Sequence, residues 1–430
     1  MPVTSRLHPA WGALALLVAA AGALRAQEPV VARPDTTVLV ADSLVGRPDT
    51  TAAADTTRQR TDVSAQDSPQ DRGIVIRSAD RSLELRVLGS MRLFGSFDFE
   101  GLPRADAFSP YEIPVPEQTR NDRFYMDARQ TRLGFETLWQ KPGSSHRLFA
   151  RIEADFAGPN NGFRLRHAYI RVDDNRIILG QTWTAFTDIA AVPLTVDLDG
   201  PASSITVRSA QIRYTHRFRE GLTLAGSIES PSVDITSTTA SDDATYQSFP
   251  DLVGQVRYNR PGLRAQGAAV FRVLAAGSDS TSPDRVPGFG LMGSVLWEVR
   301  ARQTLGAQVV LGQGISRYLT GLSGRGLDLL IDPADGGYVA PPVRGAYVSY
   351  SLVPRAGVTL NAILGGLWAP SRDFYPPEAY RRGGSLALNG FFPVFEGMQL
   401  GGELIYGWRV NQDGQSGDAL RLQARATYDF

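Results

Sequence analysis

The chain has 430 residues, of which 20% are charged, with a formal net charge of zero and no cysteine. Zero net charge removes the electrostatic argument for nucleic-acid binding, and a chain without cysteine can form neither a disulfide nor a lipoprotein acyl site. After the amino-terminal segment, no stretch offers the roughly 18 uninterrupted apolar residues of a membrane-spanning helix, which argues against a helical membrane protein.

The amino terminus has the order of a secretory signal peptide. Arg6 and His8 precede an apolar run over residues 11–22, and the small residue Ala26 stands before Gln27. The apolar run is shorter than the roughly 20 residues that a membrane-spanning helix needs. We therefore expect residues 1–26 to be a signal peptide; the alternative is a retained anchor helix.

Residues 27–72 differ in composition from the rest of the chain. They are rich in Pro, Thr, Asp, Ala and Arg, and Arg-Pro-Asp-Thr-Thr occurs at residues 33–37 and again at 47–51. Such a segment cannot bury enough apolar surface to offset the conformational entropy that ordering costs. It is predicted to be a disordered periplasmic tail, with contact to the cell wall as an alternative role. The folded domain is expected to cover residues 73–430.

From residue 83 onward, apolar and polar residues alternate as they do in β-strands, whose successive side chains point to opposite faces. The last strand, 419–430, places Leu, Ala, Tyr and the terminal Phe430 on one face, and Arg, Gln, Thr and Asp on the other. A soluble β-sandwich also alternates in this way. The expected strands are 83–99, 124–139, 146–156, 163–172, 176–186, 207–218, 222–229, 252–258, 263–274, 288–299, 305–315, 346–352, 358–367, 385–392, 398–408 and 419–430.

The connections between these strands alternate in length. Short turns such as 219–221 and 259–262 are followed by long connections such as 230–251 and 316–345. Short turns at one rim and long loops at the other are typical of a barrel that crosses a membrane, with the long loops outside the cell. The sequence therefore predicts an all-β fold, a transmembrane antiparallel β-barrel of about 16 strands with a water-filled lumen.

A hollow barrel of this size needs a segment that narrows it, and residues 187–204 are the best candidate. This connection carries Asp188, Asp197 and Asp199 among apolar residues. We expect an inward-folded constriction loop that presses its apolar residues on the wall and presents the acids to the pore. The alternative is an external loop packed on its neighbours.

The polar faces of the strands are assigned to the lumen, because a charged side chain that faces lipid is destabilising by a few kcal/mol. Rings of arginine favour anions. The alternative is that these arginines pair with neighbouring acids, Glu136 and Glu229 among them, and give no preference. Arg129 and Arg208 fall on the apolar face, so either a bulge re-aims them or they lie in a subunit interface. The predicted pore-lining residues are Arg92, Arg132, Arg147, Arg151, Arg164, Arg166, Arg213, Arg257, Arg264, Arg272, Glu153 and Asp155.

Five segments resemble the DcaP-like outer-membrane porins. The resemblance is dense from about Leu83 to Glu229 and sparse beyond it. It implies a sixteen-stranded homotrimer in the bacterial outer membrane, with an inward-folded loop and uptake of dicarboxylates and similar small anions. The tail lacks the coiled-coil-like pattern that the family often has, so tail-driven trimerisation loses its support. The segments are 128–136, 166–169, 180–186, 197–201 and 208–214.

The predicted function is passive diffusion of small hydrophilic solutes, with a preference for anions such as dicarboxylates. A pore of the phosphate or polyphosphate type and an unselective general porin are the alternatives. The expected partners are outer-membrane lipid, small anionic solutes and, by the resemblance, an assembly machinery that recognises Phe430; no nucleic acid and no cofactor are expected.

Two functions outside transport are less favoured. A barrel-type hydrolase would need a nucleophile motif or metal-ligand spacing, and only His146, His167 and His216 remain after signal removal, without either pattern. We therefore expect no catalytic residues and no metal site. A passive structural barrel would need a plug or a further domain, and the chain has no residues left over for one.

Overall fold

The computed structural model describes residues 73–115, 121–173, 175–236, 244–277, 283–369 and 374–430. The predicted signal peptide, 1–26, and the predicted tail, 27–72, lie outside the described residues. Within the described ranges, no helix has the length and apolar character needed to cross a membrane.

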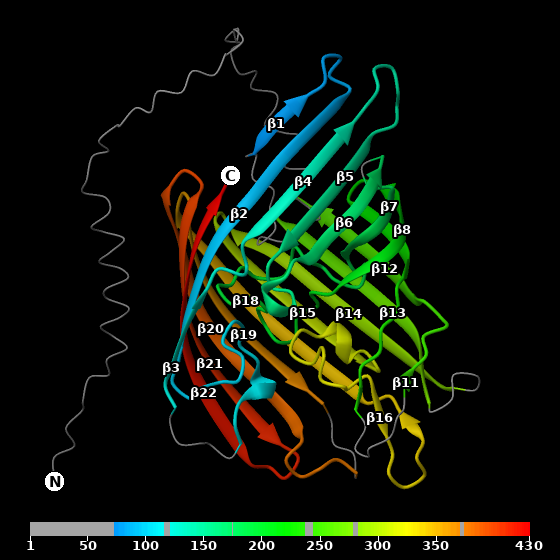
Figure 1. Cartoon of the computed structure of the whole chain (residues 1–430), viewed down its shortest axis with the longest axis vertical. Helices are drawn as coiled ribbons and strands as arrows, with labels where there is room; N and C mark the ends of the chain where they lie inside the picture. The colour runs from blue at the N-terminus through cyan, green and yellow to red at the C-terminus, as the bar shows by residue number, and fades with distance from the viewer. Residues whose placement is uncertain (1–72, 116–120, 174, 237–243, 278–282, 370–373) are drawn as a thin grey trace, which may run out of the picture. The chain divides into compact units, whose positions relative to one another are not determined.

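Sixteen antiparallel strands form a closed β-barrel, so the predicted fold class and strand number are confirmed (Figure 1). Neighbours in the chain are paired neighbours in the barrel, and β22 returns to pair with β2, with Met91 opposite Tyr428. The strands are β2 (Leu83–Asp98), β3 (Arg123–Asp127) with β4 (Arg132–Trp139), β5 (Leu148–Asp155), β6 (Arg164–Val172), β7 (Ile177–Trp183), β8 (Arg208–Arg219), β9 (Leu222–Glu229), β12 (Asp251–Arg260), β13 (Leu263–Gly277), β14 (Asp284–Arg300), β15 (Gln303–Gln313), β18 (Pro342–Arg355), β19 (Val358–Trp368), β20 (Tyr380–Phe395), β21 (Met398–Asn411) and β22 (Ser416–Asp429).

The described residues also form short strands and 3-10 turns in addition to the sixteen barrel strands. A strand at the amino-terminal end of the described chain pairs with β2, and a small separate sheet lies among the long loops. These elements are β1 (Ile74–Arg77), β10 (Ile235–Thr236), β11 (Ala244–Thr245), β16 (Leu329–Ile331), β17 (Tyr338–Val339), and the 3-10 turns η3 (Pro110–Glu112), η4 (Pro159–Asn161) and η5 (Ser316–Tyr318).

The two faces of each strand differ as the alternation predicts. In β22 the inward residues Arg421, Gln423 and Arg425 are buried inside the barrel. Large apolar side chains on the other face are exposed in the single chain, for example Val309 at 52% and Leu311 at 45%. An outward apolar band around a polar interior is the arrangement that lipid stabilises.

The two rims carry different connections. At one rim, five turns contain two residues each, as in Glu220-Gly221 and Pro261-Gly262. The second residue of these two turns has a φ of 75° and 74°, a left-handed backbone conformation that glycine adopts without a steric penalty. Long connections such as 184–207 and 314–341 leave the opposite rim. By the rule for such barrels, the short-turn rim faces the periplasm.

The strand predicted over 124–139 is interrupted, which corrects the predicted register. Asp127 pairs with Phe94, and Arg132 pairs with Ser90, so one extra residue lies in the segment 128–131. This bulge turns Arg129 inward, where its guanidinium binds Asp127 Oδ2 at 2.9 Å. Arg208 stays on the outward face, with its guanidinium 3.9 Å from the centroid of the Trp183 ring.

The seam between β2 and β22 ends at the last residue of the chain. Phe430 exchanges two backbone hydrogen bonds with Gly89, at 3.0 and 3.1 Å. Its ring lies over Gly89, in the space that a Cβ at this position would occupy. Past the end of β22, strand β1 pairs with the same edge of β2, with Ile74 opposite Val87. The closing contact therefore needs a residue without a side chain on β2.

We predict that deleting Phe430 lowers the amount of protein in the outer membrane far more than it lowers thermal stability. The deletion removes two backbone hydrogen bonds of about 1 kcal/mol each, and the remaining β2–β22 pairs still close the barrel. The melting temperature of detergent-refolded protein should therefore fall by only a few degrees, roughly 2–4 °C per kcal/mol. Quantitative blotting of outer-membrane fractions checks the first part. Normal membrane levels, or early melting of the refolded barrel, would contradict the assembly role.

Candidate pore constriction

The connection between β7 and β8 lies inside the barrel. Its residues 187–204 contact inward-facing side chains of the wall from β13 round to β21. Gln266 donates to the Thr187 carbonyl at 2.7 Å, Gln308 donates to the Ser203 carbonyl at 2.9 Å, and Asn389 donates to the Leu194 carbonyl at 3.1 Å. Backbone carbonyls of a loop without its own ladder are thereby satisfied by side chains of the wall. The inward-folded loop follows the prediction.

The acids of this loop do not all face the pore, which corrects the prediction. Asp188 is fully buried and binds the Arg264 guanidinium at 2.6 and 2.8 Å and the Ser294 hydroxyl at 2.8 Å. Asp197 is also buried and accepts the Phe108 N–H at 2.7 Å. These two acids attach the loop to the wall and to the neighbouring connection, so they do not meet a permeating solute.

Glu403 on β21 is the complementary anchor on the far side of the lumen. Its carboxylate accepts the N–H groups of Val196 and Asp197 at 3.0 and 3.2 Å. It also accepts the side-chain amides of Asn389 and Gln423, each at 2.7 Å. A carboxylate with four donors is held in one position. The loop is therefore fixed at Arg264 on one side and at Glu403 on the other.

Two further long connections pack on the inner wall, and neither was predicted from the sequence. Leu102, Phe108 and Ile113, in the connection after β2, form one buried cluster with inward residues of β19, β21 and β22. The connection after β15 contributes Tyr318 and Leu319 to a second cluster with the wall. Together with residues 187–204, these connections add apolar contacts along the inner wall.

A chain of ion pairs connects the constriction loop with the bulge between β3 and β4. Arg104 binds Asp199 at 2.9 Å and Asp106 at 3.7 Å. Arg129 binds Asp106 at 3.4 Å and Asp127 at 2.9 Å. Four of these side chains are between 18% and 37% exposed, so this lumen ion-pair chain faces water. Of its five residues, only Asp199 was among the predicted site residues.

Several of the predicted pore-lining arginines bind acids. Arg166 bridges Glu153 at 2.6 Å and Asp155 at 3.1 Å, and Arg164 binds Asp155 at 2.7 Å. Arg151 lies between Glu136 and Glu153. This arrangement fits the alternative in which lumen arginines are neutralised by neighbouring carboxylates. The residues of this inner-wall ladder are Glu136, Arg151, Glu153, Arg166, Asp155 and Arg164.

Arg272 was predicted to line the pore, and the structure contradicts this. The side chain points inward from β13 but is 0% exposed. Asp251 and Asp328 bind its guanidinium at 3.2 and 3.1 Å, and Asp251 also accepts the Tyr318 hydroxyl at 2.8 Å. The connection after β15 supplies Asp328 and Tyr318, so its inward packing removes Arg272 from the water-filled lumen.

Three other predicted cations donate hydrogen bonds to neutral side-chain oxygens. Arg92 donates to the Ser90 hydroxyl at 2.8 Å, and Arg213 donates to Gln211 Oε1 at 2.8 Å. Arg257 donates to Gln266 Oε1 at 3.0 Å. Arg147 precedes β5, outside any strand. Arg132 is buried on the inward face of β4.

Loss of the Glu403 carboxylate should release the constriction loop. A Glu403→Gln variant places an amide opposite donors, which leaves at least one N–H without an acceptor at a cost of about 1–3 kcal/mol. Single-channel conductance should rise and become noisier, and the melting temperature should fall by several degrees. The control is Glu298→Gln, an exposed acid at the periplasmic end of β14. Equal conductance of the two variants would show that Glu403 does not hold the constriction.

The constriction should also respond to pH. Burial raises the pKa of Asp197 to about 8, and the neighbouring carboxylates of Asp199 and Glu403 add to this effect. Because the pKa lies above its ordinary value, Asp197 holds a proton below about pH 8 and releases it above. Raising the pH from 6 to 9 should therefore add one negative charge and shift the reversal potential toward cations. The shift should vanish in Asp197→Asn; an identical shift there would assign the titration to another group.

Comparison with known proteins identifies a family for this chain and solved structures with a similar fold. The family model described as DcaP outer membrane protein matches residues 53–282, which is 230 of the 430 residues. No curated protein matches. Among solved structures, the outer membrane channel DcaP of Acinetobacter baumannii is 20% identical, with a TM-score of 0.72, over 83% of this chain and 99% of that one. OmpF of Salmonella typhi is 11% identical, with a TM-score of 0.55, over 83% of this chain and 100% of that one. The chain belongs to the DcaP family of outer-membrane proteins.

Proposed function

We propose that this outer-membrane channel lets small hydrophilic solutes diffuse passively and favours anions, dicarboxylates among them. The observation that carries the proposal is a group of three inward-facing arginines on adjacent strands, Arg92 on β2, Arg132 on β4 and Arg425 on β22. They are 4–7% exposed, whereas the two buried acids of the constriction loop and Arg272 are 0–1% exposed. We call this group the seam arginines.

The pairing register places the seam arginines close together. Arg92 pairs with Thr427, one inward position from Arg425, and Arg132 pairs with Ser90, one inward position from Arg92. Diagonal neighbours of this kind are about 7–8 Å apart, within reach of long side chains. Arg132 and Arg425 repel each other electrostatically. A planar guanidinium can hold a carboxylate through two parallel hydrogen bonds, so a group of three favours a solute with more than one carboxylate.

The inner-wall ladder and the lumen ion-pair chain argue for a modest preference. In both, acids and arginines alternate, so their fields largely cancel outside the group. An acid also lies near the seam arginines: Asp429 pairs with Ser90, which pairs with Arg132 on its other side. The proposed preference therefore depends on the seam arginines, while the alternating groups set the width and the polarity of the passage.

Replacing Arg132 and Arg425 by glutamine should shift the reversal potential in a salt gradient toward cations. Arg151, another predicted pore-lining residue, is not replaced because it lies between Glu136 and Glu153, so its removal would also change the charge balance of the inner-wall ladder. Planar-bilayer recording measures the effect, and succinate in place of chloride tests the dicarboxylate part.

Arg300→Gln, at the exposed periplasmic end of β14, is the matched control. It should leave the potential unchanged. If the double variant keeps the wild-type potential while its barrel remains folded, as judged by heat-dependent gel mobility, the anion preference does not come from these side chains.

Two further parts of the proposal rest on the resemblance. They are assembly as a homotrimer and recognition of Phe430 by the barrel-assembly machinery. A channel role is also preferred to catalysis, because the charged groups of the lumen are arranged as ion pairs and loop anchors. Within the described ranges, no three His, Asp or Glu residues are grouped in a way that could hold a metal ion.

A further inference from the structure

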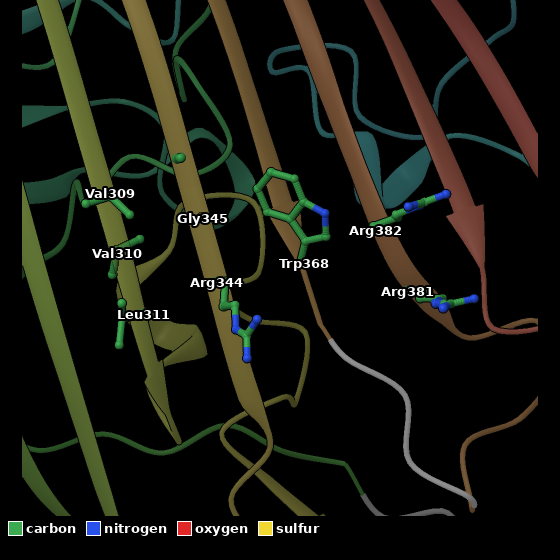
Figure 2. A pocket seen from close by; sticks show the side chains of 9 residues that line it. Val309, Val310, Leu311, Arg344, Gly345, Trp368, Arg381 and Arg382 are labelled. Atoms are coloured by element: carbon green, nitrogen blue, oxygen red, sulfur yellow. The ribbon is translucent and has the colours of Figure 1, made fainter.

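The outer wall of the barrel has a hollow near the long-loop rim, across β15, β18, β19 and β20. Figure 2 shows Trp368 between the strand that carries Arg344 and the strand that carries Arg381 and Arg382. The hollow has a volume of about 440 Å³. It is lined by Val309, Val310, Leu311, Arg344, Gly345, Ala346, Trp368, Arg381 and Arg382.

The register gives the hollow two rows of residues. The row nearer the long-loop rim is called the upper row, and the row nearer the middle of the membrane is called the lower row. In the upper row, Arg344 pairs with Trp368, and Trp368 pairs with Arg382, so two arginines flank one indole. In the lower row, Ala346 pairs with Gly366, and Gly366 pairs with Gly384. Of the lower row, Ala346 lines the hollow, while the Trp368 ring lies over Gly366 and the Trp408 ring lies over Gly384. The long cationic residues of the upper row border the hollow.

A bulge adds the third cation. Tyr380 pairs with Asn411, and Arg382 pairs with Val410, so Arg381 is the extra residue on β20. Both Arg381 and Arg382 are exposed, while Tyr380 is buried. A bulge of this kind re-aims one side chain to the face of its neighbour. No described residue forms an ion pair with Arg344, Arg381 or Arg382. The lower row continues from Gly384 to Trp408 on β21 and from there to Asp418 on β22, so this acid is two strands away from Gly384.

The height of the upper row matches the edge of the membrane. Along β18, Arg344 and Arg355 are the charged residues at the two ends, with none between them. Eleven residues of strand at about 3.3 Å each, tilted by about 40°, span about 28 Å across the membrane, close to the apolar band of about 25 Å. The arginines thus lie at the level of lipid headgroups, and the hollow below them lies at the level of acyl chains.

We propose that this hollow is a binding site for a phosphorylated lipid of the outer leaflet. The phosphate would accept hydrogen bonds from Arg344 and Arg382, with Arg381 adding charge, and an acyl chain would fill the hollow over Ala346. Charge complementarity selects this occupant, since arginine forks match phosphate oxygens. A second copy of the chain would have to bring acids to the same height, whereas a phospholipid or phosphorylated glycolipid carries its phosphate there.

The test uses the full chain purified in detergent and native mass spectrometry with two lipids of equal chains, a phosphatidic acid and the corresponding diacylglycerol. Wild-type protein should retain the phosphatidic acid about tenfold better, as expected for charge-assisted hydrogen bonds. The Arg344→Gln/Arg382→Gln variant should lose this difference. Ala346→Phe, which fills the hollow from the outward face, should weaken retention of both lipids.

Arg355→Gln, at the other end of β18, is the control and should behave as wild type. Equal retention of the two lipids by wild-type protein would overturn the proposal. So would displacement of the phosphatidic acid by excess inorganic phosphate, because the site would then recognise phosphate without a lipid. If the arginine variant instead changes the mass of the protein oligomer and wild-type protein retains neither lipid, the face is a contact between copies.

Discussion

Closure of the backbone hydrogen-bond ladder is the constraint on which the rest of this structure depends. In the hydrocarbon region there is no water to satisfy an unpaired strand edge, and each unpaired backbone group costs several kcal/mol. The β2–β22 pairing removes the last two edges, and it extends to the final residue, Phe430. Gly89 has no side chain, so the Phe430 ring can lie on β2 at the end of the seam. The inward and outward faces of all sixteen strands are defined only because this seam has one register.

Because the strands satisfy one another's backbone groups and the outer face is apolar, the polar side chains gather in the lumen. The connection between β7 and β8 enters it without strands of its own, so side chains of the wall must satisfy its carbonyl and N–H groups. Glutamine and asparagine side chains donate hydrogen bonds to its carbonyls, and the Glu403 carboxylate accepts hydrogen bonds from its N–H groups. The buried pair Asp188–Arg264 is worth little as a source of net stability, because desolvation of both charges opposes their attraction. Its geometry specifies where the loop begins its path across the lumen.

The sequence predicts the barrel well because alternation is a local property. Leu420 to Phe430 alternate whatever lies opposite them, and β22 has that alternation in the structure. A bulge was one of the two explanations offered for Arg129, but its position at 128–131 could not be predicted, because one extra residue is visible only against its partner strand, where Asp127 and Arg132 face Phe94 and Ser90. The same holds for the bulge at Arg381.

Site residues depend on contacts that alternation does not encode. The carboxylate of Asp188 meets Arg264, 76 positions later, only after the barrel has closed. Leu102, Phe108 and Ile113 lie in a Pro-rich connection whose composition is equally compatible with an external loop. Arg272 has the same inward parity as Arg264, yet a loop residue, Asp328, covers it. The alternation along a strand therefore predicts which face a charged residue occupies, whereas the loops decide whether water reaches it. In this barrel the connections that enter the lumen divide the inward arginines into anchors, ladder members and the seam group.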